Sequence, residues 1–449
     1  MTGRGVLAAF LGLVLTLAFV PASQAADART PALLADKIDF VYAIYYPAPP
    51  EAPLAALDKA LADHAGLKRV DTLPEKPPGA VVWSTYDTNI AQTYPPPSVQ
   101  LIQRFGHGLS LEQAAALQQS KSALVLEFSY PGGLYLTALR SADQLVMQLA
   151  SSTGGLIWDE ETREIFTPSE WKKRRIDSWS GDIPDVLKHT VIHAYKGDKL
   201  VRAISLGMAK FGLPDVVVDD FSWSSNRAVG NLINILSQAL VEGAAISSTG
   251  PVDLDLRAIR HDSVRQPLLD TLLPKATAVA KLSLSNGRWE EGDPRNRLLE
   301  IGFDRYAGPD RYARQDALMA SMFGFADEVK AIKHTNDLLA ASEAAKAKLP
   351  ALRKAFNQGL QPGEYILLKA PFTTPGDGRE WMWVEVSSWS DKKIVGLLKN
   401  EPAHIPQLHA GQVVTIAQGD VFDYIRYDAA GNQEGNETSK IIERMTGRK

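Results

Sequence analysis

The segment REWMWVEVSSWSDKKIVGLL, residues 379–398, decides the fold of the C-terminal part of the chain. Its first half alternates apolar and other side chains with period two, which is typical of a strand with one buried face. Met382, Val384 and Val386 lie on one face. Trp381, Trp383 and Glu385 lie on the other. The turn-forming stretch 390–393 separates this strand from a second one, Lys393–Leu398. The pattern predicts two neighbouring antiparallel strands.

Further strand-like runs lie on both sides of this pair. They are Tyr365–Lys369, Gln412–Ala417 and Val421–Tyr427. Five short strands with turns between them predict a small bent antiparallel sheet or a barrel-like domain. An Ala- and Lys-rich helix, about 327–349, precedes the strands, and we expect Pro350 to end it, because proline disrupts helix interiors.

Several motifs in this region occur in a linked order. They are REWMWVEVSSWSDKKIVGLLKNEP at 379–402, LHAG at 408–411, Asp423-Tyr424 and GNET at 435–438. Together they resemble the bacterial YegJ-like domain, a family known as domain of unknown function twenty-three-fourteen, over about 339–444. Tyr424 stands where the family usually has Trp, and Lys440 where Arg is common, so both departures keep the chemical type. The family has no established activity, so the resemblance implies a domain and no chemistry.

Six residues of this region are candidates for a binding site. Four polar residues match the family motifs at expected strand ends or turns: Asn400, Asp423, Asn436 and Thr438. Two aromatic residues, Trp381 and Trp383, lie on the outward face of the first strand. An aromatic wall with a few polar groups is typical of a ligand pocket. Alternatively, the polar side chains hold turns and bind backbone N–H groups.

The preceding part of the chain alternates strands and helices irregularly. The expected strands are 38–46, 123–130, 155–159, 191–195, 200–207 and 216–218. The expected helices are 54–67, one starting at a Ser110/Gln113 capping box, 141–151, one starting at Thr167, and 231–241. This pattern favours a mixed α/β layer domain over residues 26–249, and an α+β class over a parallel dinucleotide-binding sheet.

A Ser- and Gly-containing break at 247–253 suggests a boundary. Beyond it, two strand-like runs with Asn286-Gly287 between them and a helix at 310–323 predict a small hairpin-plus-helix unit over residues 250–330. The C-terminal domain then covers 331–449. The stretch 206–215 also resembles, faintly, bacterial domains of unknown function found beside immunity-type proteins, which suggests a binding role.

Residues 1–25 have the three zones of a secretory signal peptide. Arg4 precedes an apolar run, Val6–Val20, and the small residues Ser23 and Ala25 favour cleavage before Ala26. The run is shorter than the roughly 20 residues of a membrane-spanning helix, so we expect no stable membrane anchor. The expected location is periplasmic or secreted.

Composition and motifs narrow the function classes. Lys+Arg 48 against Asp+Glu 52 gives a net charge of −4, which provides no basis for nucleic-acid binding. With Cys 0, thiolate nucleophiles, disulfides and Cys-ligated metals are excluded. Esterase, P-loop and dinucleotide-binding motifs do not occur. His189 and His193 fall near an apparent strand, where side chains four residues apart are about 13 Å from each other, too far to bind one metal ion. We therefore expect no cofactor, no metal and no identifiable catalytic residue.

One acidic group is the exception. Asp215, Asp219 and Asp220 flank a β-branched run, and carboxylates at a strand end can hold a hard cation or act as acid and base. The acidic stretch 159–162 is instead interpreted as a hairpin turn. The sequence favours a non-enzymatic binding protein of the cell envelope, with an unidentified protein or small molecule as partner. The alternative is an envelope hydrolase that uses Asp or Glu.

Overall fold

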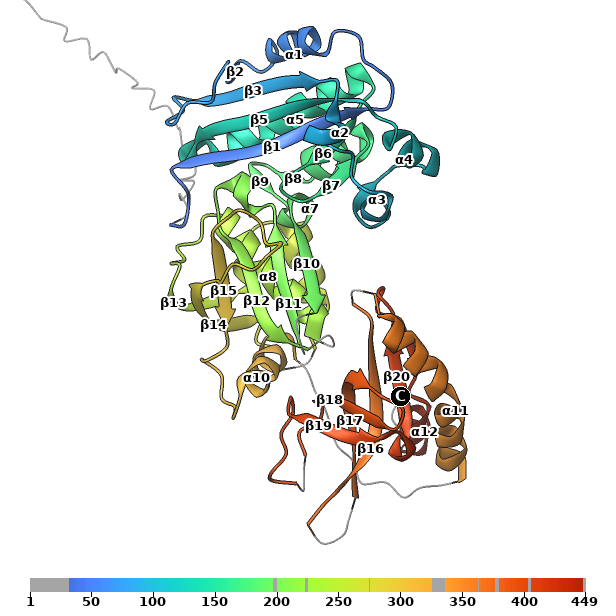
Figure 1. Ribbon diagram of the computed structural model, residues 1–449. Helices are drawn as coiled ribbons and strands as arrows, with labels where there is room; N and C mark the ends of the chain where they lie inside the picture. Colours follow the sequence, from blue (N-terminus) through green and yellow to red (C-terminus); the bar gives the residue numbers. More distant parts are fainter. Residues whose placement is uncertain are drawn as a thin grey trace, which may run out of the picture.

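The computed structural model describes residues 32–196, 200–222, 225–273, 275–324, 336–361, 363–375, 379–402 and 405–446. Within these ranges the strands form one seven-stranded sheet, two six-stranded sheets and a two-stranded ribbon. Helices pack on the three large sheets, which confirms the expected α+β class (Figure 1). The expected signal peptide lies outside the described residues.

The first sheet has the strand order β2-β3-β5-β1-β6-β7-β4. Its strands are β1 (Lys37–Tyr46), β2 (Leu67–Arg69), β3 (Ala80–Asp87), β4 (Gly106–His107), β5 (Ser122–Pro131), β6 (Leu156–Asp159) and β7 (Glu164–Phe166). The accompanying helices are α1 (Pro53–Leu61), α2 (Ile90–Thr93), α3 (Val99–Phe105), α4 (Leu111–Leu117), α5 (Tyr135–Thr153) and α6 (Pro168–Trp171). The predicted capping box of Ser110 and Gln113 is confirmed at the start of α4.

Strand β1 is central because both of its faces are buried. Phe40, Tyr42 and Ile44 belong to the main core, whereas Ala43 and Tyr45 belong to a smaller cluster on the other face. The β-branched and aromatic composition that predicted this strand therefore serves two layers of packing at once.

The second sheet has the order β10-β11-β12-β15-β14-β13. Its strands are β10 (Val191–Lys196), β11 (Val201–Leu206), β12 (Asp215–Phe221), β13 (Gly250–Asp255), β14 (Val279–Asn286) and β15 (Leu298–Gly302). Its helices are α7 (Val186–His189), α8 (Asn226–Val241), α9 (Asp262–Asp270) and α10 (Arg311–Phe323). Along the chain, the π-helical turn η2 (Lys172–Ile176) and the ribbon of β8 (Trp179–Ser180) and β9 (Ile183–Pro184) connect the two sheets. The 3-10 turn η3 (Met208–Phe211) lies between β11 and β12.

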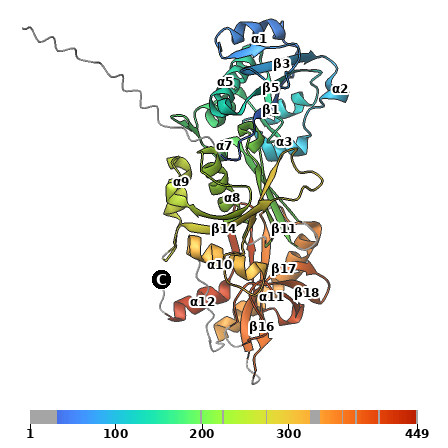
Figure 2. The same ribbon diagram turned by 90° about the vertical axis from the view of Figure 1, so that its left-hand side faces the viewer.

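The boundary expected between residues 249 and 250 falls within this second sheet. Strand β12 pairs in parallel with β15, which joins residues from both sides of that boundary. A single hydrophobic cluster also extends from Ile38 to Met322 and includes both sheets. The described residues between 32 and 324 therefore form one body with two sheets. The C-terminal domain follows at the end of the second sheet, away from the first (Figure 2).

The C-terminal domain is an open antiparallel sheet with the order β19-β18-β17-β16-β20-β21. Its strands are β16 (Tyr365–Thr373), β17 (Arg379–Trp389), β18 (Lys393–Leu398), β19 (Val413–Ala417), β20 (Asp423–Tyr427) and β21 (Gln433–Gly435). The expected face of Met382, Val384 and Val386 is confirmed as buried core. Helices α11 (Asn336–Gln358) and α12 (Glu437–Thr446) complete the domain.

The expected end of α11 at Pro350 is wrong. The helix continues to Gln358 with Pro350 in its interior. Pro350 is exposed, while Leu349 and Leu352 are buried against the sheet. Burying a leucine contributes about 1.5–3 kcal/mol, so two such contacts offset the roughly 3 kcal/mol that an interior proline costs.

Candidate functional site

Asp423 and Thr438, two of the predicted binding residues, contact each other. Asp423 Oδ2 accepts hydrogen bonds from Thr438 N at 2.9 Å and Thr438 Oγ1 at 2.5 Å, and its Oδ1 accepts one from Tyr424 N at 2.8 Å. Both Asp423 and Thr438 are fully buried. The carboxylate thereby satisfies backbone and side-chain donors at the start of α12, which is a structural task.

The two asparagines also bind backbone groups. Asn400 Oδ1 accepts a hydrogen bond from Trp383 N at 2.6 Å, beside β17. Asn436 has a φ of 64°, a left-handed conformation that asparagine adopts more readily than most residues, and its N–H donates to Tyr424 O at 2.8 Å. The structure therefore gathers Asp423, Asn436 and Thr438 at the start of α12 and places Asn400 elsewhere.

Trp381 and Trp383 lie half-buried on the outward face of β17. The ring of Trp381 packs on Phe422 with centroids 4.5 Å apart, and Lys369 Nζ lies 5.4 Å from the centre of the Trp383 ring. These contacts are local to the outer face of the sheet.

The carboxylates of the acidic run have separate surroundings. Asp215 is fully buried and accepts a hydrogen bond from Asn296 Nδ2 at 2.7 Å, and burial raises its pKa to about 6. Asp219 pairs with Arg202, and Asp220 is exposed at the end of β12. The three do not converge in one cleft, so the geometry does not favour acid–base chemistry there.

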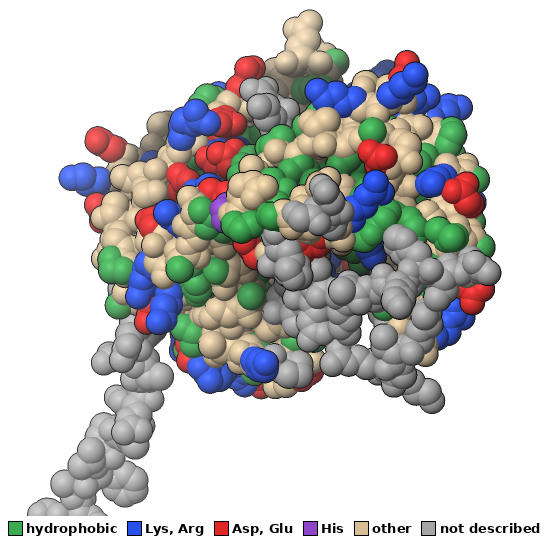
Figure 3. All heavy atoms as spheres, turned by 90° about the horizontal axis from the view of Figure 1, so that it is seen from below, with side chains coloured by type: hydrophobic (Ala, Val, Ile, Leu, Met, Phe, Trp, Pro, Cys, Tyr) green, Lys and Arg blue, Asp and Glu red, His purple; other side chains and the backbone are tan. Residues whose placement is uncertain are grey.

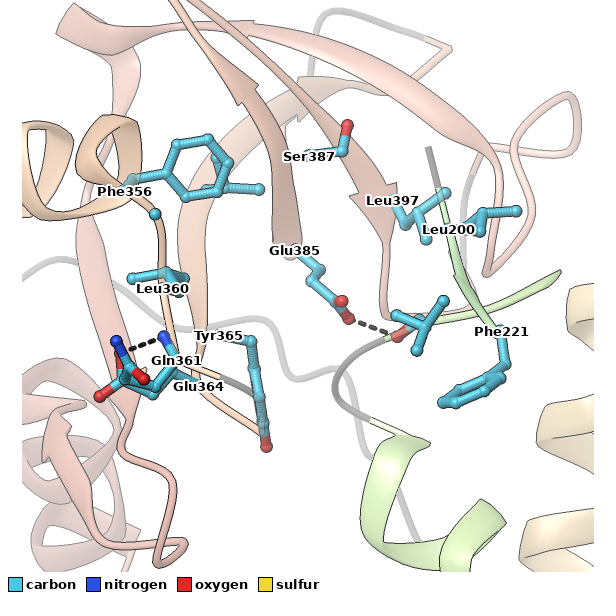
Figure 4. A pocket seen from close by; sticks show the side chains of 14 residues that line it. Leu200, Phe221, Phe356, Leu360, Gln361, Glu364, Tyr365, Glu385, Ser387 and Leu397 are labelled. Carbon is cyan, nitrogen blue, oxygen red and sulfur yellow. Dashed lines mark hydrogen bonds between the residues drawn. The ribbon is translucent and has the colours of Figure 1, made fainter. Parts of the chain in front are cut away.

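A cavity of about 190 Å³ lies between the second sheet and the C-terminal domain (Figure 4). Its walls come from the β11 start, the β12 end, the loop between α11 and β16, and strands β17 and β18. The lining residues are Leu200, Val201, Phe221, Ser222, Phe356, Gly359, Leu360, Gln361, Glu364, Tyr365, Glu385, Val386, Ser387 and Leu397. Ligand sites are often found between domains and combine apolar walls with a few polar groups.

Glu385 is the buried carboxylate among the described lining residues of this cavity. Glu385 is 4% exposed and lies on the same face of β17 as Trp381 and Trp383. Its Oε2 accepts a hydrogen bond from Ser222 Oγ, and Ser222 directly follows β12 of the second sheet. Lys399 Nζ donates to Ser222 Oγ at 3.1 Å and lies 3.9 Å from Glu385 Oε2. These three side chains join the two bodies of the molecule.

Glu364 and Tyr365 form the other polar side of the cavity. Glu364 Oε2 accepts a hydrogen bond from Gln361 N at 3.0 Å, and its Oε1 lies 3.6 Å from Arg426 Nη2. The Tyr365 ring stacks on Tyr427 with centroids 4.7 Å apart. Burial raises the pKa of Tyr365, which keeps its hydroxyl protonated.

Only part of the signal for this cavity is present in the sequence. The period-two alternation of the sequence predicted Glu385 on the outward face of β17, as the structure shows, but did not identify it as a site residue. A carboxylate in a strand that is otherwise mostly apolar was the available clue. Ser222 offered none, because it lies 163 residues from Glu385 in the chain.

A second polar group, the ion cluster, lies inside the two-sheet body and consists of Asp159, Glu164, Arg175 and Lys210. Arg175 is fully buried, and its Nη2 donates to Asp159 Oδ2 and Glu164 Oε2, each at 2.9 Å. Lys210, also fully buried, donates to Asp159. The hairpin turn predicted at 159–162 exists, yet its first residue belongs to this cluster.

Asp143 lies beside the ion cluster. It is fully buried, accepts a hydrogen bond from Tyr42 Oη at 2.8 Å and lies 3.8 Å from His189 Nδ1. Burial raises the pKa of Asp143 to about 7, although the charges of Lys210 and Arg175 act in the opposite direction. Burial lowers the pKa of His189, so this imidazole is neutral. Residues of β1, α5, α7, η2 and η3 meet here, at the junction of the two sheets.

The described ranges contain no group of three His, Cys, Asp or Glu side chains placed to hold a metal ion. Nor does any helix within them have the length and apolar character needed to cross a membrane. On the face seen in Figure 3, basic and acidic side chains are interspersed.

Comparison with known proteins agrees with the motifs of the C-terminal domain. No curated protein and no solved structure matches the chain. Residues 336–449 match the model of a family described as an uncharacterized protein conserved in bacteria (DUF2314), so this C-terminal domain is similar to the bacterial family that its motifs indicated.

Proposed function

We propose that this protein is a binding protein of the bacterial cell envelope, and that the cavity between the second sheet and the C-terminal domain receives its ligand. The ligand is a small molecule or a side chain of a protein partner. The observation that carries the proposal is the cavity itself, which has apolar walls and a buried carboxylate, Glu385.

The size of the cavity supports a small ligand group. Its volume of about 190 Å³ is below the roughly 300–1,000 Å³ of sites for drug-sized molecules. Because both bodies contribute walls, a bound group would contact both and favour the arrangement in which they are joined. The hydrolase alternative depended on Asp215, Asp219 and Asp220, whose separate partners make a binding role the better supported function.

A variant that fills the cavity tests the proposal. Leu360 lines it from a loop, so Leu360→Trp should occupy the space with little effect on the two sheets. Fragments that raise the melting temperature of the parent should fail to do so for this variant. Leu339→Trp is the matched control, because Leu339 is 49% exposed on α11. Fragments that stabilise Leu360→Trp as much as the parent would place the ligand elsewhere.

The envelope location is a separate part of the proposal and rests on residues 1–25. We expect export with cleavage before Ala26. Mass spectrometry of fractionated cells should find a mature chain that begins at Ala26. A chain that retains Met1 and is recovered from the cytoplasm would contradict export without affecting the cavity.

A further inference from the structure

We propose that strand β19 is an interface through which two copies of this chain associate edge to edge, about a two-fold axis at Thr415. The inference goes beyond the proposed function, because no residue of β19 is among the described lining of the cavity. It rests on the backbone groups at the free edge of β19, on the composition of this strand, and on a register in which the strand is complementary to itself.

β19 lies at the edge of the C-terminal sheet, where β18 is its one neighbour among the described strands (Figure 1). Two hydrogen bonds, one at each end, show which of its residues face β18. Leu398 N donates to Gln412 O at 2.9 Å, and Gln418 N donates to Lys392 O at 2.9 Å. Backbone groups of an antiparallel strand point alternately to its two sides, so the even-numbered residues of β19 face β18. The N–H and C=O groups on the free side belong to Val413, Thr415 and Ala417.

These outward groups are accessible to another strand. Within the described ranges, no residue donates a hydrogen bond to them or accepts one from them. The side chains of Val413, Thr415 and Ala417 are exposed, while Val414 and Ile416 are buried in the core of the domain. β19 therefore presents a regular row of backbone donors and acceptors beside an apolar face that is already covered.

The other edge strands of the three large sheets carry features that discourage pairing with a further chain. Natural proteins keep such edges short, cover them, or place proline and charged side chains on them. β2, β4 and β21 have only two or three residues. β13 contains Pro251 and two aspartates, and in β10 the ring of Phe105 stacks on His193. β19 has none of these features, because its sequence, VVTIA, is uncharged and four of its five residues are β-branched.

A second copy of β19 matches this edge in the antiparallel direction. With the two-fold axis at Thr415, all five residues are paired: Val413 opposes Ala417 of the second copy, and Thr415 opposes its own counterpart. These are the residues with outward backbone groups, so each pair can exchange two N–H···O bonds. A Thr–Thr pair across strands is favourable, and no charges face each other. On the other face, Val414 lies opposite Ile416 of the second copy, so the match favours a second copy of this chain over an unrelated strand.

Sedimentation equilibrium of the mature chain, residues 26–449, tests the proposal and should show a monomer–dimer equilibrium. Thr415→Lys places two like charges at the axis and should weaken dimerisation about tenfold at low salt. Because Thr415 is exposed, the melting temperature of the dilute variant should equal that of the parent. Thr373→Lys is the matched control, since Thr373 is exposed at the end of the inner strand β16. It should dimerise like the parent.

Two further variants examine the axis and the backbone pairing separately. An equimolar mixture of Thr415→Lys and Thr415→Glu chains brings opposite charges together at the axis, so it should associate more tightly than either variant alone. Val413→Pro removes an outward N–H at the first residue of the strand, a position where proline is tolerated. It should weaken dimerisation about tenfold, because one hydrogen bond is lost from each copy.

Two results would overturn the proposal. One is a parent chain that stays monomeric at the highest concentration measured, which includes the case in which a strand of another protein covers β19. The other is a dimer that Thr415→Lys and Val413→Pro leave intact, because association would then use another surface. Neither result would affect the cavity, whose test is the stabilisation by fragments.

Discussion

The two-sheet body and the C-terminal domain both bury acidic side chains, but they compensate the charge differently. In the ion cluster, Arg175 donates directly to Asp159 and Glu164 at 2.9 Å, and no member is exposed by more than a few per cent. In the cavity, Lys399 lies 3.9 Å from Glu385, and the carboxylate forms part of the lining. Closely paired buried charges join elements within one body, whereas the Glu385 carboxylate lies at a cavity between the two bodies.

The largest effect should come from removing the central cation of the ion cluster. Arg175→Met leaves Asp159 and Glu164 buried without their shared donor, so we expect a loss of about 3–5 kcal/mol in the free energy of unfolding. Urea unfolding measures it. Arg257→Met, at an exposed pair with Asp255, should be close to neutral. Similar losses for both variants would show that the ion cluster has no special structural role.

The next largest effect should be the pH dependence of the free energy of unfolding that Asp143 causes. Its pKa is raised in the folded state to about 7, so the native protein binds a proton that the unfolded chain, with a pKa near 4, has lost. The resulting stability is present below about pH 4 and is lost as the pH rises through 7. Asp143→Asn should therefore gain stability relative to the parent over this range, by up to about 4 kcal/mol.

The comparison of parent and variant is essential for this measurement. His189, with a lowered pKa, acts in the opposite direction, since the unfolded chain takes up a proton below about pH 6.5. The charged or titrating neighbours Tyr42, Asp159, Arg175 and Lys210 are present in both proteins. Denaturation series at pH 4, 5, 6 and 7 supply the data. A difference that does not change with pH would mean that Asp143 titrates normally.

Asp423→Asn separates the structural and binding interpretations of the C-terminal motif residues. The Asp423 carboxylate accepts hydrogen bonds from Tyr424 and Thr438, and the amide of an asparagine can accept only part of them. We therefore expect a loss of about 1.5–3 kcal/mol in the free energy of unfolding. Fragments that stabilise the parent through the cavity should stabilise the folded variant by the same amount, because Asp423 does not line the cavity. Asp420→Asn, at an exposed position of the same domain, is the control. A variant with parental stability and weaker ligand binding would support the binding interpretation.

The smallest effect should come from the junction of the two bodies. Ser222→Ala removes the hydroxyl between Glu385 and Lys399 and should lower the free energy of unfolding by about 1 kcal/mol. Chemical denaturation of this variant beside Ser388→Ala, at an exposed position on the C-terminal domain, measures the difference. No difference from Ser388→Ala would indicate that the junction does not depend on this serine.

The sequence by itself determined the local elements. Period-two alternation located β17 and its buried face, the Ser110/Gln113 pair located the start of α4, and linked motifs identified the similarity of the C-terminal domain. These signals arise from interactions between residues close in the chain, or from backbone periodicity, which any reader of the sequence can detect.

Only the tertiary structure decided how these elements combine. The pairing of β12 with β15 merged two expected units into one body, and core packing carried α11 through Pro350. The cavity depends on Ser222 and Glu385, which the fold brings together although 163 residues separate them. Such contacts depend on long-range packing, in which side chains become neighbours without leaving a periodic pattern in the chain.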